Sequence, residues 1–127
     1  MIIVPAYAVL FACLFLTLSI RTIRARRLAK VAIGTGGDRV LERLSRVHAN
    51  FSEYVPFTLL LIALSEMRGI HHVIIHGLCL ALLVGRCAHA WGVSNRTENF
   101  RFRVIGIALT LNTISAAAVA NAVSYFL

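Results

Sequence analysis

Two long runs of uncharged, mostly apolar residues limit what this chain can fold into. Residues 104–127 hold twenty-four residues without Asp, Glu, Lys or Arg, and residues 2–20 hold nineteen. A bilayer core of about 30 Å needs about 20 apolar residues in a helix, so each run can cross it. Of the 127 residues, 59% are hydrophobic and 14% are charged, whereas soluble domains carry roughly 25% charged residues. The length suits a single domain, residues 1–127.

The first run is expected to stay in the mature protein. A signal peptide opens with basic residues and closes with a small-residue cleavage site. Here no basic residue precedes the run, and arginines follow it, beginning at Arg21. We therefore expect a membrane helix and not a cleaved segment.

Two further spans complete the predicted fold. Residues 71–93 form a mostly apolar segment interrupted by one charge, Arg86, while residues 55–64 are too short to cross a bilayer alone. The second helix must therefore begin upstream, near Asp38, which is a suitable N-cap, although Gly37 would also serve. The sequence predicts an all-α membrane protein, an up-down bundle of four transmembrane helices at about 2–27, 38–68, 71–93 and 101–126. Ser115, Asn112 and Asn121 are expected to form hydrogen bonds between helices.

The basic residues predict the orientation. The second connection contains only Arg68 and the third span only Arg86, whereas the first and third connections and their flanks carry the other cations (Arg21, Arg24, Arg26, Arg27, Lys30, Arg39, Arg43, Arg46, Arg96, Arg101 and Arg103). By the positive-inside rule, the first and third connections face the cytoplasm and both termini lie on the opposite side. The net charge of +8 is then a topology signal, and no nucleic-acid partner is expected.

A polar stripe precedes the apolar half of the second helix. Arg43, Arg46, Asn50 and Glu53 are spaced by 3, 4 and 3 residues, which puts them on one helical face. Tyr54 lies at the edge of this face. One interpretation is an intrahelical ladder in which Arg46 and Glu53 bind Asn50 beside water. The other is a binding site, because ionisable residues at membrane depth usually line one.

The third and fourth helices add cations at the same end of the bundle. Arg86 and His89 share a face of the third helix, and Arg101 and Arg103 open the fourth. Arg86 alone is also compatible with snorkelling to the interface. Together these residues predict a cationic pocket with a single acid, Glu53. Such a pocket suits a small molecule with several carboxylates and an amine.

At this point the sequence resembles the MAPEG family, the membrane-associated proteins in eicosanoid and glutathione metabolism. The resemblance covers the whole chain and is carried by R-V-H-A-N-F-S-E-Y-V-P at residues 46–56, R-C-A-H at 86–89 and R-F-R at 101–103. It is strongest to the short bacterial members. It implies a homotrimer in the bacterial inner membrane, with glutathione bound as co-substrate between neighbouring subunits toward the cytoplasm.

The resemblance also implies roles for individual residues. Arg103 is the implied thiolate-stabilising residue, with Arg101 as the second candidate, and one of Arg24, Arg26 or Arg27 is implied to reach glutathione in the adjacent subunit. The remaining implied glutathione contacts are Arg46, Asn50, Glu53, Tyr54, Arg86 and His89. In one respect the chain departs from the eicosanoid enzymes, because Val93 stands where they have a tyrosine.

Two functions follow as expectations. The first is a glutathione-dependent transferase or peroxidase, in which an arginine-stabilised thiolate attacks a lipophilic electrophile or hydroperoxide from the membrane. The alternative is a non-catalytic membrane protein with a structural, assembly or sensing role and a retained or vestigial glutathione site. No metal site is predicted, and Cys13, Cys79 and Cys87 are expected to be small buried apolar residues. A haem site or a transporter is less compatible with these residues.

Overall fold

Four helices make up the fold of the chain. The computed structural model describes residues 2–94, 97 and 99–126. The helices are α1 (Ile3–Ala29), α2 (Arg39–Met67), α3 (His72–Ser94) and α4 (Phe100–Phe126), and each is long and apolar enough to cross a membrane. The predicted all-α membrane fold is therefore confirmed. Arg96 and Leu127, which entered the predictions above, lie outside the described residues.

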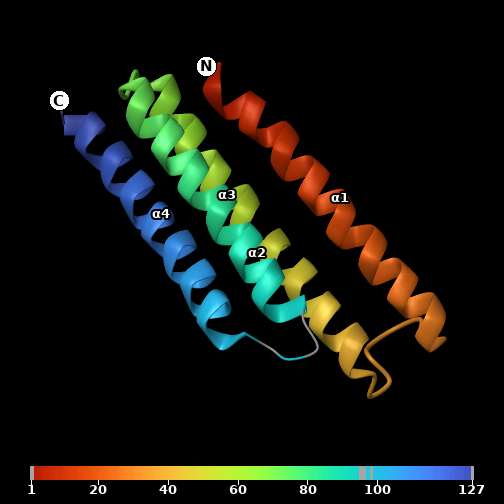
Figure 1. Cartoon of the computed structure of the whole chain (residues 1–127). Helices are drawn as coiled ribbons and strands as arrows, with labels where there is room; N and C mark the ends of the chain where they lie inside the picture. The colour runs from red at the N-terminus through yellow and green to blue at the C-terminus, as the bar shows by residue number, and fades with distance from the viewer. Residues whose placement is uncertain (1, 95–96, 98, 127) are drawn as a thin grey trace.

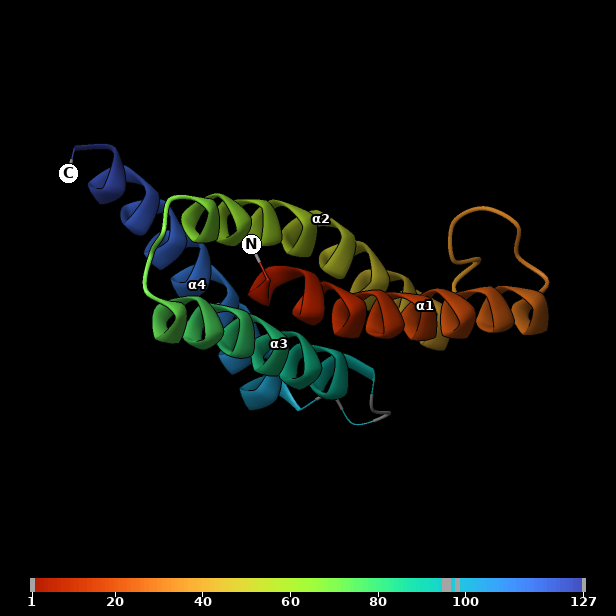
Figure 2. The ribbon, with the colours of Figure 1, turned by 90° about the horizontal axis from the view of Figure 1, so that it is seen from above.

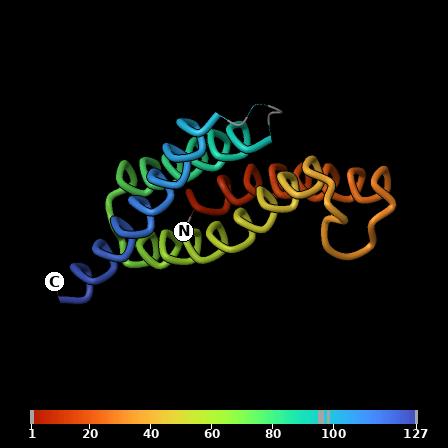
Figure 3. The backbone as a smooth tube through the Cα atoms, turned by 90° about the horizontal axis from the view of Figure 1, so that it is seen from below, coloured from red at the N-terminus to blue at the C-terminus, as the bar shows by residue number. Residues whose placement is uncertain are grey.

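The helices run up and down along a common direction. The two ends of the chain lie at one end of the bundle, and the connection between α1 and α2 lies at the other (Figure 1). Seen from above and from below, the C-terminal part of α4 extends beyond the other helices (Figures 2 and 3). Tyr125 and Phe126 on this extension are correspondingly exposed. Below, the end with the α1–α2 connection is called the basic end, and the other the terminal end.

Local sequence signals account for the ends of α1 and α2. Lys30, just after α1, adopts a left-handed backbone conformation with φ 55°, and its N–H donates to the carbonyl of Arg27. Asp38 Oδ1 accepts a hydrogen bond of 2.8 Å from the N–H of Leu41, so the predicted N-cap is confirmed. α2 then continues through Pro56 to Met67 without interruption, and the short apolar run belongs to a helix of full membrane length.

Glycines allow α3 and α4 to pack closely. A Cβ atom at Gly106 would lie 2.6 Å from the carbonyl oxygen of Gly85 and 2.6 Å from the backbone nitrogen of His89. A Cβ atom at Gly92 would lie 2.7 Å from the backbone nitrogen of Arg103. Small residues are the usual means of bringing membrane helices together, because no hydrophobic effect drives them to associate in lipid. The first turns of α4 are thereby held against the last turns of α3.

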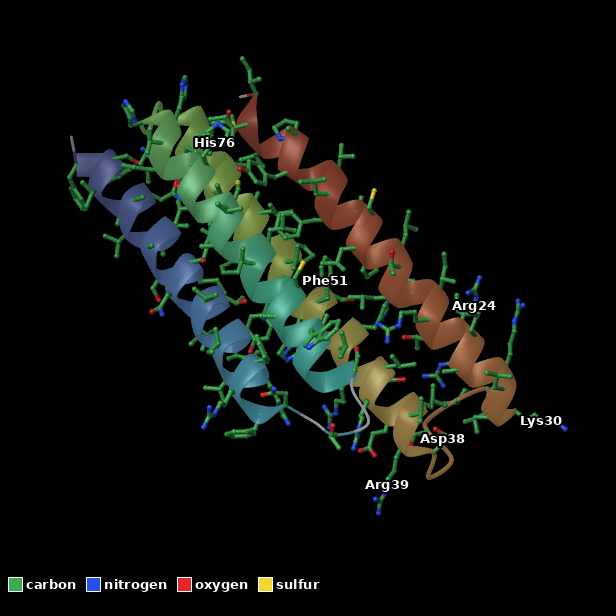
Figure 4. The ribbon with its side chains drawn as sticks, viewed as in Figure 1. Arg24, Lys30, Asp38, Arg39, Phe51 and His76 are labelled. Atoms are coloured by element: carbon green, nitrogen blue, oxygen red, sulfur yellow. The ribbon has the colours of Figure 1, made fainter. Side chains whose placement is uncertain are left out.

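Polar contacts fasten the terminal end. The carboxylate of Glu66, near the end of α2, accepts hydrogen bonds from the backbone N–H groups of Ile2, Ile3 and Val4. These are among the N–H groups that a helix start leaves without an internal partner. Tyr7 Oη and His76 Nδ1 are 3.2 Å apart and join α1 to α3. Figure 4 shows His76 on the side of α3 that faces the start of α1.

Two sequence-based expectations about buried residues are partly wrong. Cys79 is buried, but Cys13 and Cys87 are exposed on the outer faces of their helices, where lipid surrounds a membrane span. Asn112 and Ser115 are likewise exposed, whereas Asn121 does bridge helices, donating to the carbonyl of Leu61 and the hydroxyl of Ser65 on α2. Apolar outer surfaces are compatible with lipid, so hydropathy alone does not tell which face of a span is inside.

Candidate functional site

A polar pocket lies between α2, α3 and α4 toward the basic end of the bundle. Its volume is about 550 Å³. It is lined by Glu42, Arg43, Arg46, Ala49, Asn50 and Glu53 of α2, His89 and Val93 of α3, and Arg103 of α4. The structure therefore brings together six of the candidate residues singled out in the sequence: Arg43, Arg46, Asn50, Glu53, His89 and Arg103.

The stripe on α2 faces this pocket, and two of its charged side chains, Arg46 and Glu53, are available there. Among the described residues, neither Arg46 nor Glu53 has a hydrogen-bond or ion-pair partner. The intrahelical ladder proposed as an alternative is not formed, because Asn50 bonds across to α3 and not along its own helix. A guanidinium and a carboxylate that share one pocket without binding each other are available to a ligand that carries both charges.

Arg86 lies behind the pocket wall and does not line it. Only 2% of its surface is exposed. Nη1 donates to Asn50 Oδ1 on α2, and Nη2 donates to the carbonyl of Gly106 on α4 at 3.2 Å. The snorkelling alternative is therefore wrong, since this guanidinium points into the protein and ties three helices together.

Tyr54 also lies outside the pocket lining. Its ring centroid is 5.9 Å from the Cζ atom of Arg86, within the range of a cation–π contact. His89, in contrast, lines the pocket with 6% of its surface exposed. Tyr54 and Arg86 thus form a second layer behind the residues that face the cavity.

Of the two arginines at the start of α4, Arg103 lines the pocket and Arg101 is exposed elsewhere. The close approach at Gly92 explains this placement, because it brings the backbone of Arg103 against the end of α3. Arg103 and Arg43 also take part in other interactions within the protein.

The arginines at the end of α1 are separate from this pocket within one chain. Arg26 and Arg27 line a different hollow of about 350 Å³. Arg26 Nη1 donates to the carbonyl of Gly34 at 2.8 Å, which fastens the connection to α2. Arg24 is exposed, and Figure 4 shows its side chain pointing away from the other helices. None of these three arginines lines the pocket of its own chain.

Two lining residues on α2, Glu42 and Ala49, were not singled out in the sequence. Arg43 was placed in the polar stripe but not among the implied glutathione contacts. The expectation of a single acid is wrong, since Glu42 joins Glu53 in the lining. Helical periodicity could have predicted the position of Glu42, because it lies four residues before Arg46 and therefore on the same face of the helix. It was missed because the first turn of α2 lies outside the apolar run.

Comparison with known proteins agrees with this architecture. The family model described as "MAPEG family" matches residues 4–123. "Inner membrane protein YecN" of Escherichia coli strain K12 is 35% identical over 115 residues, covering 91% of this chain and 86% of that protein. The protein of the same name from Escherichia coli O6:H1 matches to the same extent. The chain belongs to the MAPEG family and is an integral membrane protein.

Proposed function

We propose that this protein is a glutathione-dependent membrane transferase or peroxidase that binds glutathione in the pocket between α2, α3 and α4. The observation that carries the proposal is the pair Arg46 and Glu53, which have no partner among the described residues and face one cavity of about 550 Å³ together with Arg43 and Arg103. The size and charges of this cavity suit a peptide of three residues.

Glutathione carries groups that complement those charges. Its two carboxylates are matched by the guanidinium groups of Arg43 and Arg46, which bind carboxylates through two parallel N–H groups. Its ammonium group is matched by Glu53, and Glu42 adds a second acid at the same cavity. A purely anionic ligand would leave both of these acids unmatched, so a zwitterionic peptide fits better.

The chemistry depends on the thiol. A free thiol with a pKa near ~8.5 is mostly protonated at neutral pH, and the thiolate is the nucleophile. Arg103 is the group that we assign to stabilise the anion, since it is the α4 arginine that lines the pocket. In a transferase step the thiolate sulfur bonds to carbon of a lipophilic electrophile and a leaving group departs. In a peroxidase step two glutathiones give the disulfide and reduce a hydroperoxide to an alcohol and water.

The proposed assembly is a homotrimer in the inner membrane, with the basic end of the bundle in the cytoplasm. The placement of Arg24 and Arg27 supports it, since these exposed cations lie outside the pocket of their own chain. In a trimer one of them reaches the pocket of the neighbouring subunit. The electrophile then arrives from the surrounding lipid, where apolar molecules concentrate.

One observation favours the alternative, a non-catalytic protein that retains the site. Val93 lines the pocket, and its side chain offers no hydroxyl to a bound thiol. A protein of this kind would bind glutathione and leave its thiol protonated.

The experiment is calorimetric titration of the purified protein in detergent with glutathione. We expect the wild type to bind, and Arg46→Ala and Glu53→Ala each to weaken binding at least about tenfold, since each removes one charge-assisted contact. Arg39→Ala is the matched control. It removes the same charge from the same helix, but Arg39 does not line the pocket and points away from the bundle in Figure 4.

Each result has a definite meaning. Loss of binding in both pocket variants with normal binding in the control supports the glutathione site, and turnover of an aromatic halide or a lipid hydroperoxide then supports the enzyme. A folded, oligomeric wild type that binds no glutathione refutes the proposal. Binding with a protonated thiol and no turnover supports the non-catalytic alternative.

A further inference from the structure

Among the residues that the structure describes, no carboxylate balances the charge of Arg86. In the part of the chain that the structure describes, its guanidinium bonds only to two neutral oxygens, those of Asn50 and Gly106. Its Nε atom is buried without a partner. A charge desolvated in this way is costly, and replacing buried ionic groups by apolar ones is often neutral or stabilising. Stability of the bundle is therefore a poor explanation for an arginine at this place.

The contact with Asn50 has a consequence for the pocket. An asparagine side chain ends in one oxygen and one NH₂ group of nearly the same size, so its orientation is set by its hydrogen bonds. Here Oδ1 accepts from Arg86, which can only donate. The NH₂ group of Asn50 is therefore the end that remains for the pocket, which Asn50 lines.

We propose that Arg86 is a positioning residue that never touches the ligand: it holds the Asn50 amide with the NH₂ group toward the pocket, so that this group donates to a carboxylate or carbonyl oxygen of bound glutathione. The inference rests on the proposed function and adds to it. It replaces direct contact between Arg86 and glutathione, implied by the family resemblance, with an indirect role. A reversed amide would set an oxygen against an oxygen of the ligand.

Tyr54 supports the same arrangement from the other side. Its ring lies 5.9 Å from the guanidinium carbon of Arg86. The carbonyl of Gly106 holds the second nitrogen at 3.2 Å and also accepts from the hydroxyl of Thr110. The guanidinium is thus confined by contacts from α2 and α4 while it directs Asn50, which is the arrangement expected of a group that orients another.

The decisive test uses Asn50→Asp, in which the expected effects on stability and on binding have opposite signs. The new carboxylate would accept from Arg86, so the midpoint of thermal unfolding without ligand should be equal to or higher than in the wild type. Glutathione affinity should fall at least about tenfold, because an acceptor replaces the donor that faces the pocket. Wild-type affinity in Asn50→Asp would overturn the proposal.

A double-mutant cycle tests the indirect action. Arg86→Gln should weaken glutathione binding about tenfold in the wild type but less than about twofold in an Asn50→Ala background. An equal loss in both backgrounds would show that Arg86 acts on the ligand without Asn50, and would overturn the inference. If Arg86→Gln does not fold, Arg86→Met, which removes both the buried charge and every donor to Asn50, is measured in the same two backgrounds against the same criterion.

The wild-type titration distinguishes a failure of the proposed function from a failure of the role proposed for Arg86. If the wild type does not bind glutathione, the proposed function fails and this inference fails with it. If the wild type binds and Asn50→Asp or the cycle gives the overturning result, only the role of Arg86 is refuted.

Discussion

Asn121 on α4 donates a hydrogen bond of 2.8 Å to the hydroxyl of Ser65 on α2, and the same nitrogen lies 2.9 Å from the carbonyl of Leu61. Ser65 is itself fully buried. Polar contacts of this kind join membrane helices that no hydrophobic effect brings together. One amide thus supplies two polar contacts between α2 and α4 at the terminal end of the bundle, where Arg68 also donates to the carbonyl of Ser124.

Asn121→Ala should therefore loosen α4. We expect a loss of roughly 1–2 kcal/mol in the free energy of unfolding, because the two hydrogen bonds from Asn121 to the carbonyl of Leu61 and the hydroxyl of Ser65 are lost. The measurement is thermal unfolding in detergent. Asn112→Ala is the matched control on the same helix, since Asn112 is exposed. Equal midpoints for the two variants would show that the bridge contributes nothing.

Gly106→Ala should be among the most damaging small substitutions in the chain. Its new Cβ atom would lie 2.6 Å from both the carbonyl oxygen of Gly85 and the backbone nitrogen of His89, and neither backbone can give way cheaply. We expect α3 and α4 to separate at a cost of at least about 1–3 kcal/mol. Because Arg86 bonds to the carbonyl of Gly106, glutathione affinity should fall together with the unfolding temperature.

The control for this overpacking is Gly77→Ala on α3. No atom lies within 4 Å of a Cβ built at Gly77. Alanine also has the higher helix propensity, so the variant should be as stable as the wild type or slightly more stable. A Gly106→Ala protein with an unchanged unfolding temperature would contradict the close packing described here.

Glu66→Ala should free the start of α1. Three N–H groups, those of Ile2, Ile3 and Val4, lose the carboxylate that accepts from them. We expect hydrogen exchange at these amides to accelerate by about tenfold or more, since a charged acceptor is worth roughly 1.5–3 kcal/mol. Glu66→Gln keeps one acceptor oxygen and should give an intermediate rate. Unchanged exchange in Glu66→Ala would mean that α1 is held by other contacts.

Arg103→Ala should raise the pKa of the bound glutathione thiol, because the guanidinium that favours the thiolate is removed. The near-ultraviolet absorbance of the thiolate, followed during a pH titration of the glutathione complex, reports this value directly. Arg101→Ala should leave the titration curve unchanged, as Arg101 is exposed and does not line the pocket. A raised thiol pKa in Arg101→Ala and an unchanged one in Arg103→Ala would instead assign stabilisation of the thiolate to Arg101.

Much of the architecture could be predicted from the sequence because the physics that sets it is local. A bilayer demands about 20 apolar helical residues, and the runs at 2–20 and 104–127 meet that demand without further information. The N-cap Asp38 and the face shared by Arg46, Asn50 and Glu53 also follow from short-range geometry. These features depend on residues within a few turns of one another.

Contacts between helices could not be predicted in the same way. The partner of Arg86 is 36 residues away on α2, and helical periodicity does not say which helix an arginine meets. The choice of Arg103 over Arg101 depends on how closely α4 approaches Gly92, which is a property of packing and not of sequence spacing. The exposure of Cys87 could not be predicted either, since an apolar side chain is stable against lipid as well as against protein.

The contact between Glu66 and the start of α1 also imposes an order on the synthesis of the chain. The acceptor lies 64 residues after its first donor, so α1 enters the membrane with its first N–H groups still waiting for a partner. The carboxylate of Glu66 can accept from them only after α2 has crossed the membrane in the opposite direction and residue 66 lies at the terminal end of the bundle. A nascent chain that threads its second helix wrongly keeps those groups open, and the first helix remains unanchored until the topology is correct.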